Sequence, residues 1–466
     1  MREADLTGSP GTLLYKTDPR FLSVALDWAV VLGERWWDNA RRVSRGFGTV
    51  RAEALRLDEE RLITAASSLA PAYLRLGGSE SDRIVFGQEE DRTEACPTRL
   101  TPERWDEAAA FAAAAGLDLF VCVGAGVCHR DGRGVWSEAS FRRFLNHVTA
   151  SKHHVPVWEL GNEVNGFPFM HGLSSWVSAS RYTNDFRRFR EILRREIPDA
   201  RGAGPATAVW PVLGEPLPMA RGVARRLGPT LDLLTWHYYP YQSSRGRVAT
   251  RRVRRRTVLW GGARRSAVRM AGRMRRIATR NGSAEVWLGE TGHALFGGQR
   301  GFSDRYAGSL WWLDHLGSMA SNGATGLVRQ ALVGGEYGLL EAGTFRPRPD
   351  FWCSLLWKRV MGPLVYKPLH LGLTFRVYRH AWEERGVGML LINTSRKKSA
   401  KAKLPAGSRG WRLEGELGAP WIAVNGRILG PDDEPAATSL PEALELPGTL
   451  LLPPASALFV QSPRAR

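Results

Sequence analysis

Two glutamates, each at the end of an apolar stretch, could carry out acid–base chemistry together. Glu163 lies in "VWELGNEVNGF" (157–167) and Glu290 lies in "VWLGETGH" (286–293). Glycoside hydrolysis needs such a pair, because one carboxyl group protonates the leaving oxygen while the other, ionised, attacks the anomeric carbon. Retention of configuration requires about 5–5.5 Å between the two groups. The two glutamates therefore predict a retaining glycoside hydrolase, provided that the fold brings them together.

Other apolar stretches also end in polar residues. Asp27 ends "FLSVALD" (21–27), and His237 and Tyr239 lie at the end of "LDLLTWHYY" (231–239). Each residue alone has an ordinary structural explanation: a carboxylate after a strand is commonly a helix cap or an ion-pair partner, and His237 could be a satisfied core histidine. The combination of these residues at strand ends is what favours an active site.

The elements that would position these residues alternate between apolar stretches and helix-like segments, which is typical of a parallel sheet. Eight such stretches fit an α/β (β/α)8 TIM barrel better than a doubly wound sheet, which usually has fewer strands. The predicted strands are 21–27, 72–78, 117–124, 155–163, 200–204, 231–239, 284–290 and 324–331. In this fold the carboxyl ends of the strands surround the active site. The fourth and seventh strands would let Glu163 and Glu290 face each other.

Two helix starts and a second domain can also be predicted. Thr101 and Ser137 are N-cap candidates, because each precedes a helix-like segment that begins with Pro or Glu. After Lys367 the helical periodicity fades, and short strand candidates separated by Gly, Pro, Asn and Asp predict a β-sandwich. We expect a barrel at 21–364, a β-sandwich domain at 365–466, and an N-terminal segment, 1–20, that pairs with the sandwich.

The net charge of +19 comes mainly from arginine. A positively charged surface suits polyanions, namely nucleic acid, anionic glycans or an anionic membrane. The alternative explanation of the positive net charge is an Arg-rich genome. Much of the densest segment, 245–280, reads as a helix with arginines on its solvent-exposed face, and the segment could also line a cleft. A nucleic-acid binder would show aromatic-rich recognition motifs, which we do not find. A non-catalytic barrel that binds carbohydrate is disfavoured because both glutamates are present.

Metal and cofactor sites are not predicted. The four cysteines form no CxxC pair, the histidines are scattered and no Asp-rich loop occurs. Cys122, inside "LFVCVG", reads as a buried thiol, and disulfides stay open. The sequence contains no run of about 18 apolar residues, so no transmembrane helix is predicted. Membrane association stays possible. The first residues lack the apolar stretch of a signal peptide. The location is thus secreted or periplasmic if a signal was removed, and otherwise cytoplasmic.

Several longer motifs resemble the heparanase family, glycoside hydrolase family 79. They include "LAPAYLRLGGSESD" (69–82), "WELGNEVNGF" (158–167), "TWHYY" (235–239), "VWLGETGHALFGG" (286–298) and "PDFWCSLLWKRVMGPLV" (349–365). The resemblance runs across most of the chain. It implies a retaining β-glucuronidase that forms a covalent glycosyl-enzyme intermediate and needs no cofactor.

The resemblance also assigns roles by position. Glu163 would be the general acid/base, Glu290 the nucleophile, and Asn162 a partner of the sugar 2-hydroxyl. Tyr239 would orient Glu290, with His237 beside it. Tyr337 and the backbone N–H groups near Gly297 and Gly298 would hold the uronate carboxylate. Asp27 would bind hydroxyls of the same sugar. Glu159 has no such assignment, and we expect it to support the site from behind or to face a helix.

Three departures from the family bear on the substrate. Vertebrate heparanases carry Gln and Arg where this chain has "GPATAVWP" (204–211), Lys where it has Glu80, and Gly where it has Phe296. Sulfate-binding arginines would instead come from 245–256. The chain has no long linker after the second strand, which favours endo action on heparan sulfate or a related glucuronate-containing polysaccharide. Exo action on terminal glucuronate is the alternative.

Overall fold

The computed structural model describes residues 2–37, 49–87, 96–246, 248–254, 257, 259, 261–282, 285–382 and 386–463. Within the Arg-rich segment, residues 247, 255, 256, 258 and 260 therefore lie outside the described residues, as do 88–95 after the second predicted strand. Among the described helices, none is both long and apolar enough to cross a membrane.

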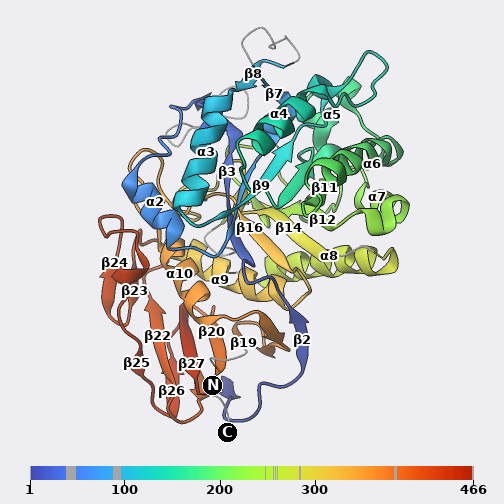
Figure 1. The fold of residues 1–466 in the computed structure, drawn as a ribbon. Helices are drawn as coiled ribbons and strands as arrows, with labels where there is room; N and C mark the ends of the chain where they lie inside the picture. Colours follow the sequence, from blue (N-terminus) through green and yellow to red (C-terminus); the bar gives the residue numbers. More distant parts are fainter. Residues whose placement is uncertain are drawn as a thin grey trace.

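Eight parallel strands close into a barrel, with helices around it (Figure 1). Each of the eight predicted strands is present, and the predicted (β/α)8 architecture is confirmed. The strands, in order around the barrel, are β3 (Leu22–Asp27), β6 (Tyr73–Gly77), β9 (Asp118–Val123), β10 (Val157–Leu160), β11 (Arg201–Val209), β12 (Leu233–Tyr238), β14 (Glu285–Thr291) and β16 (Gly326–Arg329).

The barrel interior changes from apolar to charged along the strands. One buried cluster takes a single residue from each strand: Ala25, Tyr73, Phe120, Val157, Ala203, Leu233, Trp287 and Val328. Residues two apart on a strand point to the same side. The next inward positions after Tyr73 and Val157 are therefore Arg75 and Glu159, which lie closer to the carboxyl ends. Glu159 therefore interrupts an apolar strand because its charged side chain points into the barrel.

Helices follow the barrel strands; the longer ones cover the outside of the barrel, and the four-residue helices α1 and α5 lie in segments at the carboxyl ends of the strands. They are α1 (Trp28–Val31), α2 (Glu60–Ser67), α3 (Pro102–Ala114), α4 (Ala139–Ala150), α5 (Phe167–Met170), α6 (Ala179–Glu196), α7 (Ala220–Leu227), α8 (Gly261–Arg280), α9 (Tyr306–Ala320) and α10 (Pro349–Val360). The Thr101 hydroxyl accepts the Arg104 N–H and caps α3, as predicted. The prediction for Ser137 was wrong: Glu138 occupies the N-cap position of α4, without a side-chain cap.

Two further sheets enclose a second apolar core. The larger sheet contains β2 (Leu13–Lys16), β17 (Leu364–Tyr366), β18 (Leu369–Leu371), β19 (Phe375–Trp382), β20 (Gly386–Asn393), β22 (Arg409–Glu414), β23 (Ile422–Val424), β24 (Arg427–Leu429), β25 (Leu444–Glu445) and β27 (Ser456–Ser462). The smaller contains β1 (Arg2–Asp5), β21 (Ala400–Lys403) and β26 (Thr449–Leu452). Apolar residues from both sheets, including Ala4, Val377 and Ala402, form one cluster.

The N-terminal segment joins these sheets by strand pairing. β1 runs parallel to β21, and β2 runs antiparallel to β17. β17 begins at Leu364, the last residue of the predicted barrel range, so this strand crosses the predicted boundary. The division at 1–20, 21–364 and 365–466 stays a proposal.

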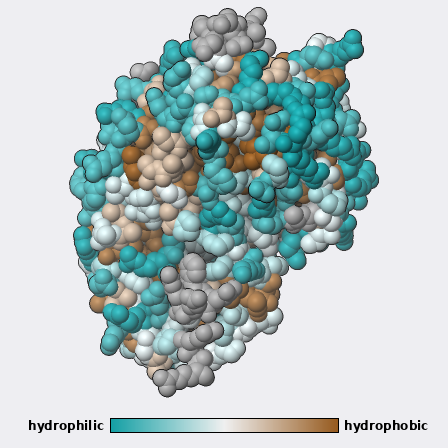
Figure 2. Space-filling view, viewed as in Figure 1, coloured by the Kyte–Doolittle hydropathy of each residue, from teal (hydrophilic) through white to brown (hydrophobic). Residues whose placement is uncertain are grey.

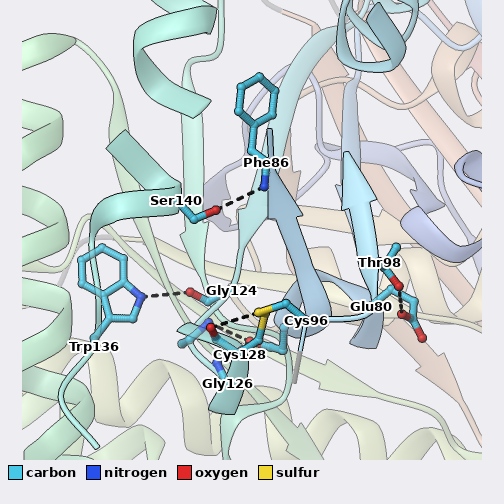
Figure 3. Close-up of a disulfide and its surroundings, with 11 residues drawn as sticks. Glu80, Phe86, Cys96, Thr98, Gly124, Gly126, Cys128, Trp136 and Ser140 are labelled. Carbon is cyan, nitrogen blue, oxygen red and sulfur yellow. Dashed lines mark hydrogen bonds between the residues drawn. A yellow bond between two sulfur atoms is a disulfide. The ribbon is translucent and has the colours of Figure 1, made fainter. Parts of the chain in front are cut away.

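A disulfide joins Cys96, before β8 (Thr98–Leu100), to Cys128 in the short helix η3 (Val127–His129) that follows β9 (Figure 3). The bond was one of the possibilities that the sequence left open. Cys122 is a buried free thiol, as predicted, and Cys353 is buried as well. The disulfide links two connecting segments at the carboxyl ends of neighbouring barrel strands.

Candidate active site

The two predicted catalytic glutamates lie next to each other at the carboxyl ends of β10 and β14. One carboxylate oxygen of Glu163, one of Glu290 and a ring nitrogen of His237 all lie within 4.8 Å of one another. Inverting glycosidases keep their carboxyl groups about 6.5–9.5 Å apart to admit a water molecule, whereas retaining enzymes need about 5–5.5 Å. Carboxylate oxygens within 4.8 Å of each other leave less room than the water of an inverting enzyme needs, so the pair fits a retaining enzyme.

Glu290 is held as an ionised carboxylate. The Tyr239 hydroxyl donates to Glu290 Oε1 at 2.7 Å, and Arg75 Nη1 donates to Oε2 at 3.1 Å. Burial pushes the pKa of Glu290 upward, but the charges of His237 and Arg75 and these hydrogen bonds outweigh it, so the pKa lies below its usual value. An ionised carboxylate against the position of a sugar is the form that a nucleophile requires.

Arg75 is a central residue of the site that the sequence reasoning missed. It is fully buried in the barrel, where Nη2 donates to Glu159 Oε2 and to Asn162 Oδ1, both at 2.8 Å. Because Asn162 presents its oxygen to Arg75, its Nδ2 group remains as a donor for a ligand. Arg75 thus ties Glu159 to both Glu290 and Asn162, which gives Glu159 the supporting role that we expected. The period-two pattern of "YLRLG" (73–77), with Tyr73 inward, was the available signal.

A second missed residue, Asp82, holds the backbone beneath the acid/base. Its carboxylate accepts N–H groups from Ala125 at 2.7 Å, Gly126 at 3.0 Å and Asn162 at 3.1 Å. Asp82 therefore joins the segments that follow β6, β9 and β10. Burial raises the pKa of Asp82 to about 7, although the three N–H groups and the charge of Arg130 act to lower it.

Glu163 has a backbone conformation that few residues other than glycine adopt, with φ 52° and ψ 47°. Such a left-handed residue costs of order 1–3 kcal/mol and persists only when its surroundings impose it. Here Asp82 fixes the preceding N–H, and Nδ1 of His237 lies 3.2 Å from Glu163 Oε1. The Glu163 side chain is 17% exposed, compared with 10% for Glu290. Glu163 is thus the more accessible carboxylate, as an acid that must reach a leaving group requires.

Asp27 lies beside the pair and has a structural task. Its side chain accepts the Ala29 N–H at 3.0 Å and caps α1. Burial raises the pKa of Asp27 well above its usual value, and the Glu290 charge adds to this shift. Gly78 permits the close approach of β6, because an added Cβ would lie 1.9 Å from Asp27 Oδ2. The helix-cap explanation and the predicted sugar contact are therefore compatible.

The predicted uronate pocket brings Tyr337 near the nucleophile, with its ring 6.1 Å from that of Tyr239. Gly297 and Gly298 both have positive φ, 77° and 84°. The Gly298 N–H donates to the Ala294 carbonyl at 3.0 Å, whereas the Gly297 N–H has no acceptor among the described residues. Of the two predicted amides, that of Gly297 is therefore the one left for a carboxylate.

An ion pair supports this pocket from outside. Arg245 donates to Glu336 Oε1 at 2.5 Å and to the Gly298 carbonyl at 2.8 Å, and Glu336 N–H donates to the Gly297 carbonyl at 2.6 Å. Arg245 is therefore buried against the pocket wall rather than offered to sulfate groups. The predicted helix is present over part of the Arg-rich segment, as α8 (Gly261–Arg280), whose Ala267, Ala271 and Met274 are buried.

The sequence predicted no metal site, yet three side chains of the active site lie close enough together to bind an ion. Among the described residues, Glu163, His237 and Glu290 are the set close enough to share an ion. Glu290 already accepts hydrogen bonds from Arg75 and Tyr239, and a second positive charge there would be repelled by the Arg75 guanidinium. The donor set therefore fits acid–base chemistry better than metal binding.

A parallel (β/α)8 barrel with two adjacent carboxylates at the carboxyl ends of its fourth and seventh strands, one of them held ionised, defines a retaining glycoside hydrolase. Comparison with known families extends this assignment. The model of the glycosyl hydrolase family 79 N-terminal domain matches residues 12–317, and the chain belongs to that family. The predicted family resemblance is confirmed.

Individual relatives agree with the family. Heparanase-like protein 1 of Arabidopsis thaliana is 28% identical over 430 residues, covering 85% of this chain and 74% of that protein. Baicalin-beta-D-glucuronidase of Scutellaria baicalensis is 28% identical over 456 residues, covering 88% and 84%. Among solved structures, a 4-O-alpha-L-rhamnosyl-beta-D-glucuronidase from Fusarium oxysporum superposes with a TM-score of 0.69 at 15% identity, covering 99% of this chain and 100% of that one. That likeness supports the fold.

Proposed function

We propose that this enzyme hydrolyses β-glucuronides with retention, using Glu290 as nucleophile and Glu163 as acid/base. The observation that carries the proposal is the adjacent pair, in which Arg75 and Tyr239 hydrogen-bond Glu290 while Glu163 remains the more exposed partner. The names of two relatives, a heparanase-like protein and a β-glucuronidase, support glucuronate as the sugar.

The reaction follows from the geometry in two displacements. Glu290 attacks the anomeric carbon as Glu163 gives its proton to the departing oxygen, which leaves a glycosyl ester on Glu290. Glu163, now ionised, takes a proton from water, and the hydroxide displaces Glu290. The Asn162 Nδ2 group donates to the 2-hydroxyl, and Tyr337 and the Gly297 N–H hold the carboxylate. Neutral donors bind this anion without the desolvation cost of a buried ion pair.

The substrate chain proposed from the sequence is an anionic, glucuronate-containing polysaccharide such as heparan sulfate, cleaved internally. Exo action on a terminal glucuronate is the second candidate, favoured by the absence of lysine and arginine from segments 164–178 and 210–219 beside Glu163. Mass spectrometry of the products from heparan sulfate distinguishes the two. Internal fragments support endo action, and free glucuronate alone supports exo action.

The chemistry is tested with 2-deoxy-2-fluoro-glucuronyl fluoride, which forms a long-lived glycosyl-enzyme. We expect the label on the peptide that contains Glu290, with no label in Glu290→Gln, and a β-configured first product from an aryl β-glucuronide by NMR. An α-configured first product, or a label on another residue, would refute the proposed mechanism.

We also propose that the protein works in an oxidising compartment, outside the cytoplasm. The Cys96–Cys128 disulfide supports this, because disulfides persist where the surroundings are oxidising. Alkylation of the denatured protein from its native source should label Cys122 and Cys353 alone, and all four cysteines after reduction. Labelling of all four without reduction would contradict the proposal.

A further inference from the structure

Two loops beside Glu163 differ in charge from the rest of the molecule. Segments 164–178 and 210–219 contain no lysine or arginine, in a chain where 65 of 466 residues are basic and the net charge is +19. The carboxylate within them, Glu215, is buried and accepts N–H groups from Met219 and Ala220. These two segments therefore contribute no cation of their own to a sulfated substrate.

The same loops expose large apolar side chains. Five residues are between 57% and 85% exposed: Phe169, Leu173, Trp176, Val212 and Leu213. In Figure 2 an apolar area lies at the upper right, where Figure 1 draws α5. Exposed apolar residues that gather in one region commonly mark a binding surface.

Their place in the fold puts these residues on one side of the catalytic pair. The first loop starts at Glu163 and continues through η4 (Val164–Gly166), α5 and η5 (Leu173–Ser175). The Asn165 side chain donates to the Ala208 carbonyl at 3.0 Å and accepts the Ala208 N–H at 2.8 Å, which joins this loop to the end of β11. The second loop follows directly, with a turn closed by the pairing of Trp210 and Gly214.

The opposite side of the pair is polar and belongs to the glucuronate. The Gly297 N–H follows β14, Tyr337 and Glu336 follow β16, and Arg245, which follows β12, pairs with Glu336. Trp210 marks the border, because its ring lies 6.3 Å from that of Phe296, next to the uronate amides. A general acid must touch the oxygen of the leaving group. The loops on the Glu163 side therefore face the leaving group.

We propose that these loops form a leaving-group site for an uncharged, apolar aglycone, an aromatic one above all. The inference rests on the proposed β-glucuronidase function and names the chemical class of the group that a terminal glucuronate carries, so it favours exo action over cleavage inside a sulfated chain. Apolar contacts with Phe169, Trp176 and Leu213 stabilise an aromatic ring through the area removed from water. The two loops themselves offer a sulfate or sulfonate no lysine or arginine, and the cations near them, Arg83 by His171 and Arg273 by Gly214, come from other segments.

Three substrates separate this proposal from the function on which it rests. They are β-glucuronyl fluoride, whose leaving group is a single atom, 2-naphthyl β-glucuronide, and its analogue with a sulfonate on the distant ring. We expect the wild type to hydrolyse the naphthyl substrate with a kcat/KM about tenfold or more above that of the sulfonated one. The sulfonate makes naphthol a better leaving group, so a slower reaction reports binding.

Variants locate the effect. Trp176→Ser and Leu213→Ser should each raise KM for the naphthyl substrate about three- to tenfold, with kcat/KM for glucuronyl fluoride unchanged. Ile428→Ser is the matched control, because Ile428 on β24 is 58% exposed, like Trp176 at 57%, but lies in the C-terminal sheet. Its kinetics should equal those of the wild type.

The outcomes that overturn the proposal are distinct from failure of the function. Equal kcat/KM for the two naphthyl substrates, or loop variants that match the wild type, would refute an apolar leaving-group site. Loop variants that change only the sedimentation of the protein would show a contact between copies instead, and would equally refute it. Failure of the wild type to hydrolyse glucuronyl fluoride would refute the β-glucuronidase function itself.

Discussion

Replacing Arg75 with methionine tests how the buried charges of the barrel are balanced. Arg75 hydrogen-bonds Glu159, Glu290 and Asn162, and the side chains of Arg75 and Glu159 are at most 1% exposed. Arg75→Met leaves Glu159 buried without its cation. Removing one partner of a buried pair typically costs about 3–5 kcal/mol. We expect the free energy of unfolding in urea to fall by that amount.

The double variant Arg75→Met/Glu159→Leu separates charge from packing. It removes both charges and keeps side chains of similar volume, and such replacements of a buried pair are often neutral or better. The double variant should therefore recover most of the stability lost in Arg75→Met. The difference between the single and double variants measures the coupling between the two residues.

Activity should respond differently from stability. Both variants remove a positive charge and a hydrogen bond from Glu290, which raises the pKa of the nucleophile. Because the nucleophile must be ionised, the acid limb of kcat/KM against pH should move to higher pH in the single and the double variant alike. The assay is hydrolysis of an aryl β-glucuronide across the pH range.

Two results would refute this reasoning. If the double variant is as unstable as Arg75→Met, the loss comes from packing and not from an unbalanced charge. If the acid limb stays in place in both variants, Arg75 does not keep Glu290 ionised. Glu159→Gln provides a further control, because it keeps the side-chain size and leaves Arg75 in contact with Glu290.

Three further predictions use the same site. Tyr239→Phe removes the 2.7 Å hydrogen bond to Glu290, so the acid limb of kcat/KM should again move to higher pH, and an unchanged profile would contradict this role. Asp82 has a native pKa of about 7, above its ordinary value of 3.8, so the native state binds its proton more tightly and the wild type loses stability as pH rises from about 4 to about 7. Asp82→Asn should flatten that part of the urea-midpoint profile, and an equally steep profile would assign the slope to other groups. Dialysis against EDTA should leave kcat/KM unchanged, and a loss that Zn²⁺ restores would show that Glu163, His237 and Glu290 hold a metal.

Much of the fold could be predicted because its signals are local. Apolar strands alternate with amphipathic helices over the first part of the chain, and this alternation decides between parallel and antiparallel sheets before any contact is known. The Thr101 cap followed from neighbouring residues for the same reason. The Ser137 cap was wrong by one residue, because the segment before α4 makes backbone contacts with His129 that the local pattern does not contain.

The residues that support the site were the ones missed. Arg75 and Asp82 lie in the recognised motif "LAPAYLRLGGSESD", yet their partners are 84 and 80 positions away, at Glu159 and Asn162. Nothing in the spacing pairs them. Arg245 shows the opposite error: its basic surroundings suggested a surface for sulfate groups, whereas Glu336 and the Gly298 carbonyl hold it in the wall of the predicted uronate pocket.

By itself the sequence determined the barrel, the two glutamates and the family, because strand period, strand-end residues and motif spacing are properties of short segments. Only the tertiary structure decided the state of those glutamates. The ionisation of Glu290 depends on Arg75 and Tyr239, and the strained conformation of Glu163 depends on contacts from other strands. Electrostatic and hydrogen-bond energies act through space over a few ångströms, so closing the barrel is what turns two scattered carboxylates into a catalytic pair.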